Sequence, residues 1–203
     1  MDTSSTTIEW EMSEVLRNAP VLQKLQDELE RAVGMGRMVR ESDLPHLLYL
    51  QAVVKETLRL HPAGPFAIHL AVEDCTVLGY EIPTNTRVLI NLWAIGRNPN
   101  TWGEDAQSFK PERFLLEAET GLTNTTHENF EWIPFGAGRR GCPGQQLGTL
   151  VVEFEVAQLL QCFNWRLPSL NGQEWEMTEM FNGLTLPRAH ELLALPTRRI
   201  PVL

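Results

Sequence analysis

The chain has 203 residues, 43% of them apolar and 21% charged, which is the composition of an ordinary globular protein long enough to bury one sizeable core. Its formal net charge of −9 argues against a nucleic-acid-binding protein, because contact with phosphates requires a basic surface. The sequence contains no apolar run of about 18 residues, so we expect no membrane span in this chain, and its polar, acidic first residues are not those of a signal peptide.

Three cysteines occur, at positions 75, 142 and 162. Their odd number and wide spacing argue against a disulfide framework or a zinc site and favour a reducing compartment. No internal repeat or low-complexity segment divides the sequence. We therefore treat residues 1–203 as a single unit with no separate second domain.

Three helices are predicted at the start of the chain. Apolar residues recur at helical spacing over residues 3–16. A second helix is predicted over residues 20–33, since it opens on a proline and is followed by a glycine. A third is predicted over residues 47–60, where an H-P dipeptide ends it.

The pattern changes after the third helix. The runs FAIHLA, CTVLGYEI and TRVLINL are β-prone and are separated by Gly, Pro and Asn. A long irregular segment is predicted from residue 97 to 134, then a helix over 144–163 that is apolar nearly all round and should be buried. Further strand candidates lie at 177–186 and 192–195. This order is not a βαβ alternation, and it predicts a mainly α protein with small β-sheets, of the α+β class.

The stretch PFGAGRRGCPGQQLG, residues 134–148, holds five glycines, two adjacent arginines and one cysteine. It formally contains G-x-G-x-x-G, the fingerprint of dinucleotide-binding loops. That fingerprint requires a strand before the loop and an acidic residue roughly 20 residues beyond it. The preceding NFEWIPF is short and residues 156–170 contain no acid, so the phosphate interpretation is disfavoured.

A metal-binding interpretation accounts for more of the same residues. Cys142 lies directly before the predicted helix, where unpaired N–H groups stabilise a thiolate. Phe135 would shield the sulfur, Arg140 would meet a carboxylate, and the glycines would let a flat cofactor lie against the backbone. The alternative, a buried free cysteine in a tight turn, is common but does not explain the glycines and the arginine around it.

Charged residues elsewhere form two further groups. In K-E-T-L-R, Glu56 and Arg59 lie on one helix face. They form either a surface ion pair or, together with Arg113 of P-E-R-F, a cluster that locks the irregular segment onto the helix. Asp2 and Thr3 offer a carboxylate and a hydroxyl, and from these residues alone a helix cap is the better interpretation.

Together these motifs resemble the cytochrome P-450 family, the haem-thiolate monooxygenases. The pattern F-x-x-G-x-R-x-C-x-G is met in full, and E-x-x-R and P-E-R-F precede it in the family's order. The phrases KETLRLHP, FKPERF and PFGAGRRGCPG look like the plant microsomal branch. The resemblance covers essentially the whole chain and implies the C-terminal part of the P-450 fold. The residues that meet the cysteine pattern are Phe135, Gly138, Arg140, Cys142 and Gly144.

The resemblance implies a role for each of these residues toward haem b, iron protoporphyrin IX. Cys142 would be the metal ligand, as the proximal thiolate of the iron. Arg140 would pair with a haem propionate, and Phe135 would shield the sulfur. Gly138 and Gly144 would leave the cofactor room against the backbone.

The resemblance also implies functional residues outside this loop. His69 aligns with a propionate-binding His or Arg, although the segment before it is one residue shorter than in relatives. Asp2 and Thr3 match the end of a helix motif that delivers protons to bound O2, and they would be catalytic. Ala63–Ile68 and Asn182–Thr185 match segments that line the substrate pocket.

The implied enzyme inserts one atom of O2 into a C–H bond of a small apolar substrate, using electrons from an NADPH-dependent flavoprotein reductase. Full-length members of this branch are anchored in the endoplasmic reticulum membrane. This chain begins part-way through the oxygen-activating helix, so we expect a truncated form. Two alternatives stay open: a non-catalytic fragment that does not hold haem stably, and a haem-thiolate isomerase or dehydratase, which the Asp2-Thr3 pair disfavours.

Overall fold

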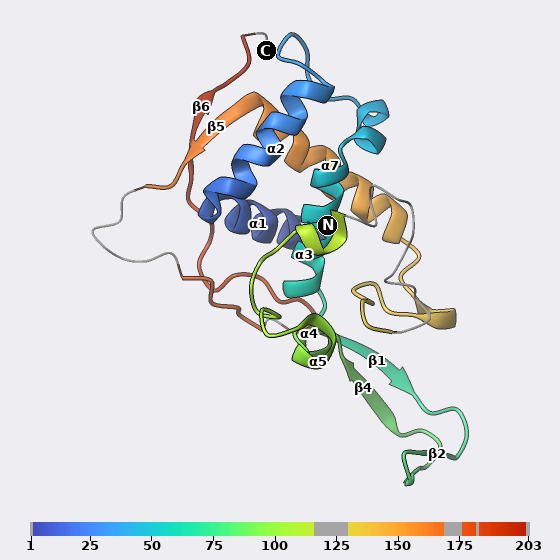
Figure 1. The fold of residues 1–203 in the computed structure, drawn as a ribbon. Helices are drawn as coiled ribbons and strands as arrows, with labels where there is room; N and C mark the ends of the chain where they lie inside the picture. The colour runs from blue at the N-terminus through green and yellow to red at the C-terminus, as the bar shows by residue number, and fades with distance from the viewer. Residues whose placement is uncertain (1, 116–129, 169–175, 182, 202–203) are drawn as a thin grey trace.

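Helices are the main secondary structure of the computed structural model, which describes residues 2–115, 130–168, 176–181 and 183–201 (Figure 1). The four long helices are α1 (Asp2–Arg17), α2 (Ala19–Ala32), α3 (Leu48–Leu60) and α7 (Gln145–Cys162). Each predicted helix is confirmed to within one residue at either end. Apolar spacing, with proline and glycine as start and stop signals, therefore sufficed to locate them.

The core lies where α7 packs against the other three long helices. α2 contributes Val21, Leu25 and Leu29, which follow one another at four-residue steps and are all buried. Such a stripe faces inward along one side of a helix, whereas its polar residues stay in water. The apolar face read from the sequence of α2 is thus the face that the protein buries.

The prediction that α7 is buried nearly all round is correct for its second half only. There Val156 and Leu160 have no exposed surface. Near the start of the helix, Leu147 is 67% exposed. The composition of a helix shows that its surface is apolar but not what covers that surface, and the described residues leave Leu147 near the start of α7 largely uncovered.

Besides residues 112–115, which are also helical, the described parts of the chain hold four short helical segments. They are η1 (Glu41–His46), α4 (Leu92–Ile95), α5 (Pro99–Trp102) and η2 (Gly138–Arg140). The segment from 97 to 134 that was predicted to be irregular begins with α5, and its residues 116–129 lie outside the described parts of the chain.

The described parts of the chain hold three sheets, each of two antiparallel strands. The first four strands are β1 (Phe66–Leu70), β2 (Cys75–Val77), β3 (Tyr80–Ile82) and β4 (Arg87–Asn91). β1 pairs with β4, and β2 pairs with β3. The run CTVLGYEI is therefore a hairpin whose turn residues, Leu78 and Gly79, have φ values of 51° and 84°.

The last sheet joins β5 (Phe163–Arg166) to β6 (Leu195–Arg198). β5 follows α7 directly and was not predicted, although its aromatic residues alternate as in a strand. The strand predicted at 192–195 begins only at residue 195. In the predicted segment 177–186, Glu179 forms an isolated antiparallel bridge with Arg188.

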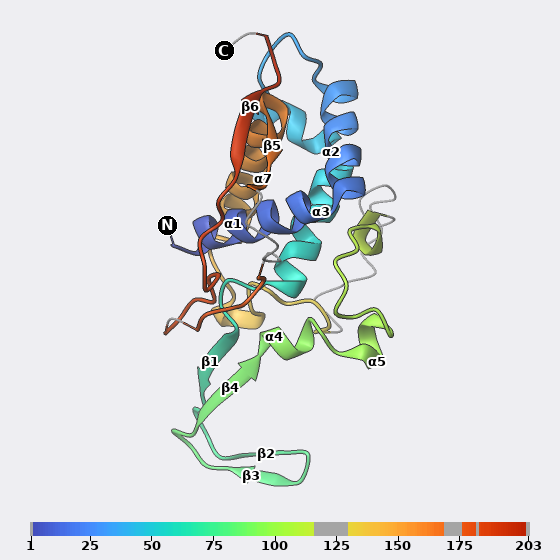
Figure 2. The same cartoon turned by 90° about the vertical axis from the view of Figure 1, so that its left-hand side faces the viewer.

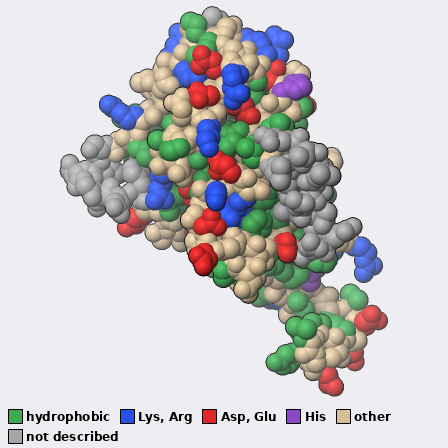
Figure 3. All heavy atoms as spheres, viewed as in Figure 1, with side chains coloured by type: hydrophobic (Ala, Val, Ile, Leu, Met, Phe, Trp, Pro, Cys, Tyr) green, Lys and Arg blue, Asp and Glu red, His purple; other side chains and the backbone are tan. Residues whose placement is uncertain are grey.

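The hairpins project away from the helical body (Figure 2). The tip formed by β2 and β3 carries exposed apolar side chains, among them Leu78 at 94% and Tyr80 at 74% exposure (Figure 3). On the same view, acidic and basic side chains alternate down the middle of the helical body. Within the parts of the chain that the structure describes, no helix is long and apolar enough to cross a membrane.

Two carboxyl groups lie in the contact between α1 and α7. Glu11 is completely buried and neither of its oxygens has a hydrogen-bond partner among the described residues. Burial, and secondly the nearby Glu153, raise the pKa of Glu11 well above its usual value. Burial also raises the pKa of Glu153 to about 7, against the opposing effect of Lys55. Both carboxyl groups are thus held in their neutral form under mildly acidic conditions.

These raised pKa values predict that the fold loses stability as the pH rises. Because the folded chain binds more protons than the unfolded chain between the unfolded pKa of about 4.5 and about 7, the free energy of unfolding falls across that interval. For Glu153 alone we expect a loss of about 2 kcal/mol, after allowing for partial solvent screening.

Urea unfolding of the chain at pH 5 and pH 8 measures this loss directly. We expect Glu153→Gln to remove most of the Glu153 contribution, because the amide has no proton to release. Glu155→Gln, on the exposed side of the same helix, controls for removal of one carboxylate. An unchanged pH slope in Glu153→Gln would contradict the assignment.

Candidate functional site

The loop that carries Cys142 has a backbone that depends on glycine. Gly136 and Gly138 have φ values of 72° and 71°, in the left-handed region that other residues avoid. At Gly141 a side chain would begin 3.3 Å from the carbonyl oxygen of Gly138. Two of the glycines are therefore needed for the chain direction and one for close packing within the loop.

Cys142 is exposed and forms no disulfide. Its backbone N–H donates to the carbonyl oxygen of Phe135 (2.9 Å), which closes the loop, and its own carbonyl accepts from the N–H of Gln145 (3.4 Å), the first residue of α7. Gly144 is the N-cap of α7 and provides no side-chain cap. The thiol thus stands at a helix start whose N–H groups favour negative charge, and the alternative of a buried cysteine in a tight turn is wrong.

The dinucleotide-binding alternative does not fit this surrounding structure. The residues directly before the loop, Glu131 to Phe135, form no strand. After the loop, α7 leads into β5, which pairs antiparallel with β6. A Rossmann loop requires a parallel strand–helix–strand unit, so the G-x-G-x-x-G match has no structural support here.

The surroundings of Cys142 suit a flat anionic cofactor with a metal at its centre. The thiol is a single soft ligand that is free and accessible. No atom of the described residues lies within 4 Å of where a side chain at Gly138 would begin, so one side of the loop is open. Arg139 and Arg140 are exposed beside it and provide positive charge for carboxylates.

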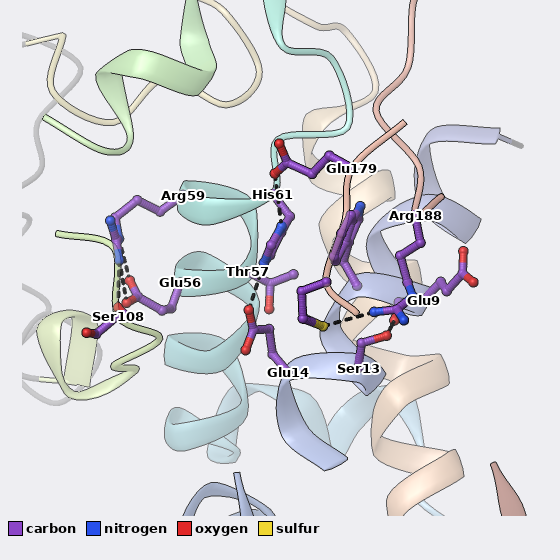
Figure 4. A network of polar contacts seen from close by, with 12 residues as sticks. Glu9, Ser13, Glu14, Glu56, Thr57, Arg59, His61, Ser108, Glu179 and Arg188 are labelled. Atoms are coloured by element: carbon purple, nitrogen blue, oxygen red, sulfur yellow. Dashed lines mark hydrogen bonds and ion pairs between the residues drawn. The ribbon is translucent and has the colours of Figure 1, made fainter. Parts of the chain in front are cut away.

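A buried charged cluster fixes the segment after α4 to the last turn of α3. Arg59 donates from Nε and Nη2 to the two carboxylate oxygens of Glu56, each at 2.7 Å, and both side chains are completely buried. Further N–H groups of Arg59 donate to the backbone carbonyls of Gly96, Ala106 and Ser108. Figure 4 shows Arg59 with Glu56 and Ser108. One guanidinium therefore satisfies three carbonyls of an irregular segment.

Arg113 completes this cluster as the sequence predicted. Its Nε lies 3.4 Å from Glu56 Oε1, which is an ion pair without a hydrogen bond. Its Nη1 and Nη2 donate to the carbonyls of Trp102 (2.9 Å) and Asp105 (2.6 Å). The surface-pair alternative for Glu56 and Arg59 is wrong, because neither side chain meets solvent.

The comparison with known proteins gives the family. The sequence model of the cytochrome P450 family matches residues 1–194. The chain belongs to this family. It is 47% identical over 202 residues to "Cytochrome P450 CYP736A12" of Panax ginseng and 46% identical over 199 residues to "3,9-dihydroxypterocarpan 6A-monooxygenase" of Glycine max. Each alignment covers 98% of this chain, but only 39% and 38% of the respective relative.

Solved cytochrome P450 structures share the fold. A zebra fish cytochrome P450 solved with abiraterone has a TM-score of 0.83 and 33% sequence identity, covering 98% of this chain and 44% of that one. A second zebra fish structure, with progesterone, has a TM-score of 0.79 at 33% identity. The α+β fold class and the P450 fold are thus confirmed for a chain that spans about two fifths of its curated relatives.

The residues predicted for cofactor binding and for catalysis lie on several elements. Five of them form the single loop described above. His69 lies on β1, half-buried and paired with Val88. Asp2 and Thr3 are exposed at the start of α1. Their roles toward a cofactor remain predictions.

Sequence reasoning missed a second polar cluster on the other side of α3. His61 is buried directly after α3, with its Nε2 2.8 Å from Glu14 and its Nδ1 3.5 Å from Glu179 (Figure 4). Its ring stacks on Trp10, with centroids 4.0 Å apart. The available signal was an acidic residue, Glu14, one helical turn from Trp10 on the first helix.

Proposed function

We propose that this P450 chain supplies the haem-binding part of a monooxygenase that hydroxylates a small apolar molecule with O2. The observation that carries the proposal is the free, exposed thiol of Cys142 at the start of α7, within a loop that glycines hold open. The cofactor we propose is haem b. When bound, it would supply the iron chemistry that inserts oxygen into a C–H bond.

The residues of the chain would bind and orient this cofactor. The Cys142 thiolate would ligate the iron, and the N–H groups at the start of α7 would stabilise its charge. Arg140, which is exposed beside the thiol, would pair with a propionate, and His69 with another. Asp2 and Thr3 would hold protons at a carboxylate and a hydroxyl near the start of α1.

The overall reaction requires partners of known chemical class. One atom of O2 enters the product and the other leaves as water, which consumes two protons and two electrons. We propose that an NADPH-dependent flavoprotein reductase supplies the electrons, and that the enzyme acts at the endoplasmic reticulum membrane, as in the plant microsomal branch. The exposed apolar side chains of Phe66, Ile68 and Leu184 favour an apolar substrate.

A second candidate is a fragment that does not retain haem. The exposure of large apolar side chains favours it. Leu184 is 77% exposed and Leu147 is 67% exposed. Apolar surface of this kind would be covered in a protein that encloses its cofactor. The two candidates differ in whether the isolated chain holds haem.

Titration with haemin, followed by reduction and carbon monoxide, separates the two candidates. We expect a strongly red-shifted Soret band, the signature of thiolate-ligated haem, and we expect Cys142→Ser to abolish it. Cys75→Ser is the matched control, because Cys75 is also exposed and free but lies on β2. A band that survives in Cys142→Ser would refute the ligand assignment, and a wild-type chain without a band would favour the fragment.

A further inference from the structure

His61 joins two carboxylates that come from distant parts of the chain. Glu14 lies on α1, and Glu179 lies in the segment after residue 175. The two ring nitrogens of His61 face one carboxylate each, at 2.8 Å and 3.5 Å (Figure 4). The contact of Nε2 with Glu14 is a hydrogen bond, whereas Nδ1 lies within ion-pair distance of Glu179 but has no hydrogen-bond partner among the described residues.

Other polar groups also face this cluster. Arg97 donates to Glu179 at 2.8 Å, and the indole N–H of Trp93 donates to the other oxygen of the same carboxylate at 2.7 Å. Arg188 contacts the face of Trp10, at 5.4 Å from the ring centroid. On α3 itself, the Glu56–Arg59 pair points to the opposite side (Figure 4).

The charge on Glu179 is consistent with this arrangement. Burial raises the pKa of its carboxyl group, but His61, Arg97 and Trp93 together outweigh that effect and hold the pKa below its usual value. Glu179 is therefore an anion in the folded chain at neutral pH. His61 thus faces an acceptor on each side.

The bridge residues His61 and Glu179 are followed in the sequence by two segments that expose apolar side chains. His61 leads directly into Ala63–Ile68, and Glu179 leads into the turn at Gly183–Leu184. The N–H of Leu186 donates to the carbonyl of Ala63 (3.0 Å), and Trp10 donates to the carbonyl of Leu186 (2.9 Å). The two segments are thus bonded to each other and to α1.

The apolar side chains of these segments meet on the exposed side. Phe66 and Phe181 contact edge to face, with ring centroids 6.2 Å apart. Phe66 is 40% exposed, Phe181 is 58% exposed and Ile68 is 56% exposed. We call the exposed side chains of Phe66, Ile68 and Phe181 the apolar wall. The segments that carry this wall also carry His61 and Glu179 of the buried polar cluster.

We propose that His61 is a positioning residue that lies between Glu14 and Glu179 and holds the apolar wall in place relative to α1. The position of the wall in turn determines the shape of the surface that the substrate contacts. The proposal rests on the proposed function for the identity of that surface. The bridge itself is a separate, measurable property of the chain.

Hydrogen exchange of the backbone amides of Leu186 and Ala189 measures the bridge without haem. We expect Glu14→Gln to speed their exchange about tenfold, because the α1 anchor of His61 weakens. His61→Phe keeps a ring to stack on Trp10 but has no donors, and we expect the same acceleration. Adding Glu14→Gln to His61→Phe should then have no further effect.

Glu9→Gln is the matched control. Glu9 lies on the same helix and accepts from the N–H of Leu192 at 2.9 Å, without involving His61. The effect of Glu9→Gln on amide exchange should be the same in the wild-type chain and in the His61→Phe chain. Independent effects of Glu14→Gln and His61→Phe, or no effect of either, would overturn the proposal. If His61→Phe is insoluble, His61→Gln takes its place in the same cycle.

Ligand affinity in the haem-loaded chain tests the consequence for the wall. Imidazole should reach only the iron, whereas 4-phenylimidazole extends toward the surrounding surface. We expect His61→Phe to weaken 4-phenylimidazole about tenfold, with imidazole affinity and the carbon monoxide spectrum changed less than twofold. Equal changes for both ligands, or none, would contradict a positioning role. Failure of the wild-type chain to bind haem would refute the proposed function, and the exchange experiment would still decide the bridge.

Discussion

Glu56→Ala is expected to lower the free energy of unfolding by about 3–5 kcal/mol, the usual cost of leaving one partner of a buried ion pair uncompensated. Glu56 accepts from Arg59 and from the backbone N–H of Lys110, all at 2.7 Å, and lies 3.4 Å from Arg113. Without the carboxylate, the buried guanidinium of Arg59 keeps its charge but loses its counter-ion. Since domains are stable by only about 5–15 kcal/mol, we expect little soluble protein at 37 °C.

Urea unfolding measures the loss, with Glu56→Gln as a milder variant that keeps one acceptor oxygen. Lys24→Ala is the control, because its ion pair with Glu112 is exposed, with 55% and 37% of the two side chains accessible. That change should cost no more than about 1 kcal/mol. Equal, small effects of Glu56→Ala and Lys24→Ala would show that the buried cluster does not hold the fold together.

The loss in free energy of unfolding caused by Arg113→Ala should lie between the losses caused by Glu56→Ala and by Lys24→Ala. Its side chain is 13% exposed, and its hydrogen bonds go to backbone carbonyls and to Asp105, which is itself 43% exposed. We expect the lesion to appear as lost solubility, because Arg113 connects the irregular segment to α3 and does not lie in the cysteine loop.

Local spacing made part of the fold and the site predictable. The helices could be located because an apolar stripe such as that of α2 repeats every turn, and Glu56 and Arg59 could be paired because i, i+3 residues share a helix face. The cysteine loop was recognisable because its glycines and Cys142 are close in sequence. Each of these features is encoded within about 20 residues.

Apart from the contact of Arg113 with Glu56, features that depend on contacts between distant residues were not predictable. Glu14, His61 and Glu179 belong to three separate segments, and only the folded chain brings them together. The burial of Glu11 depends likewise on α7, which lies more than a hundred residues further along the chain. Exposure of Leu147 could not be foreseen, because an apolar helix does not reveal its neighbours.

Gly96→Ala is expected to destabilise the chain by at least about 3 kcal/mol, at the upper end of the cost of overpacking. A methyl group at this position would lie 2.1 Å from the carbonyl oxygen and 3.1 Å from the carbonyl carbon of Arg59. Both atoms are backbone, so no side-chain rotation relieves the clash. The end of α4 would have to move away from α3, and Arg59 would lose its bond to the Gly96 carbonyl.

Gly36→Ala provides the matched control for this clash. No atom of the described residues lies within 4 Å of where its methyl group would be, and its φ is not in the left-handed region. We expect its free energy of unfolding to stay within about 0.5 kcal/mol of wild type, or to rise slightly because alanine restricts the unfolded chain. Since both variants add one methyl group at a glycine, the difference between them isolates the contact of α4 with the last turn of α3. A Gly96→Ala chain as stable as Gly36→Ala would mean that the two backbones do not approach this closely, and the carbonyl contacts of Arg59 would then need a different explanation.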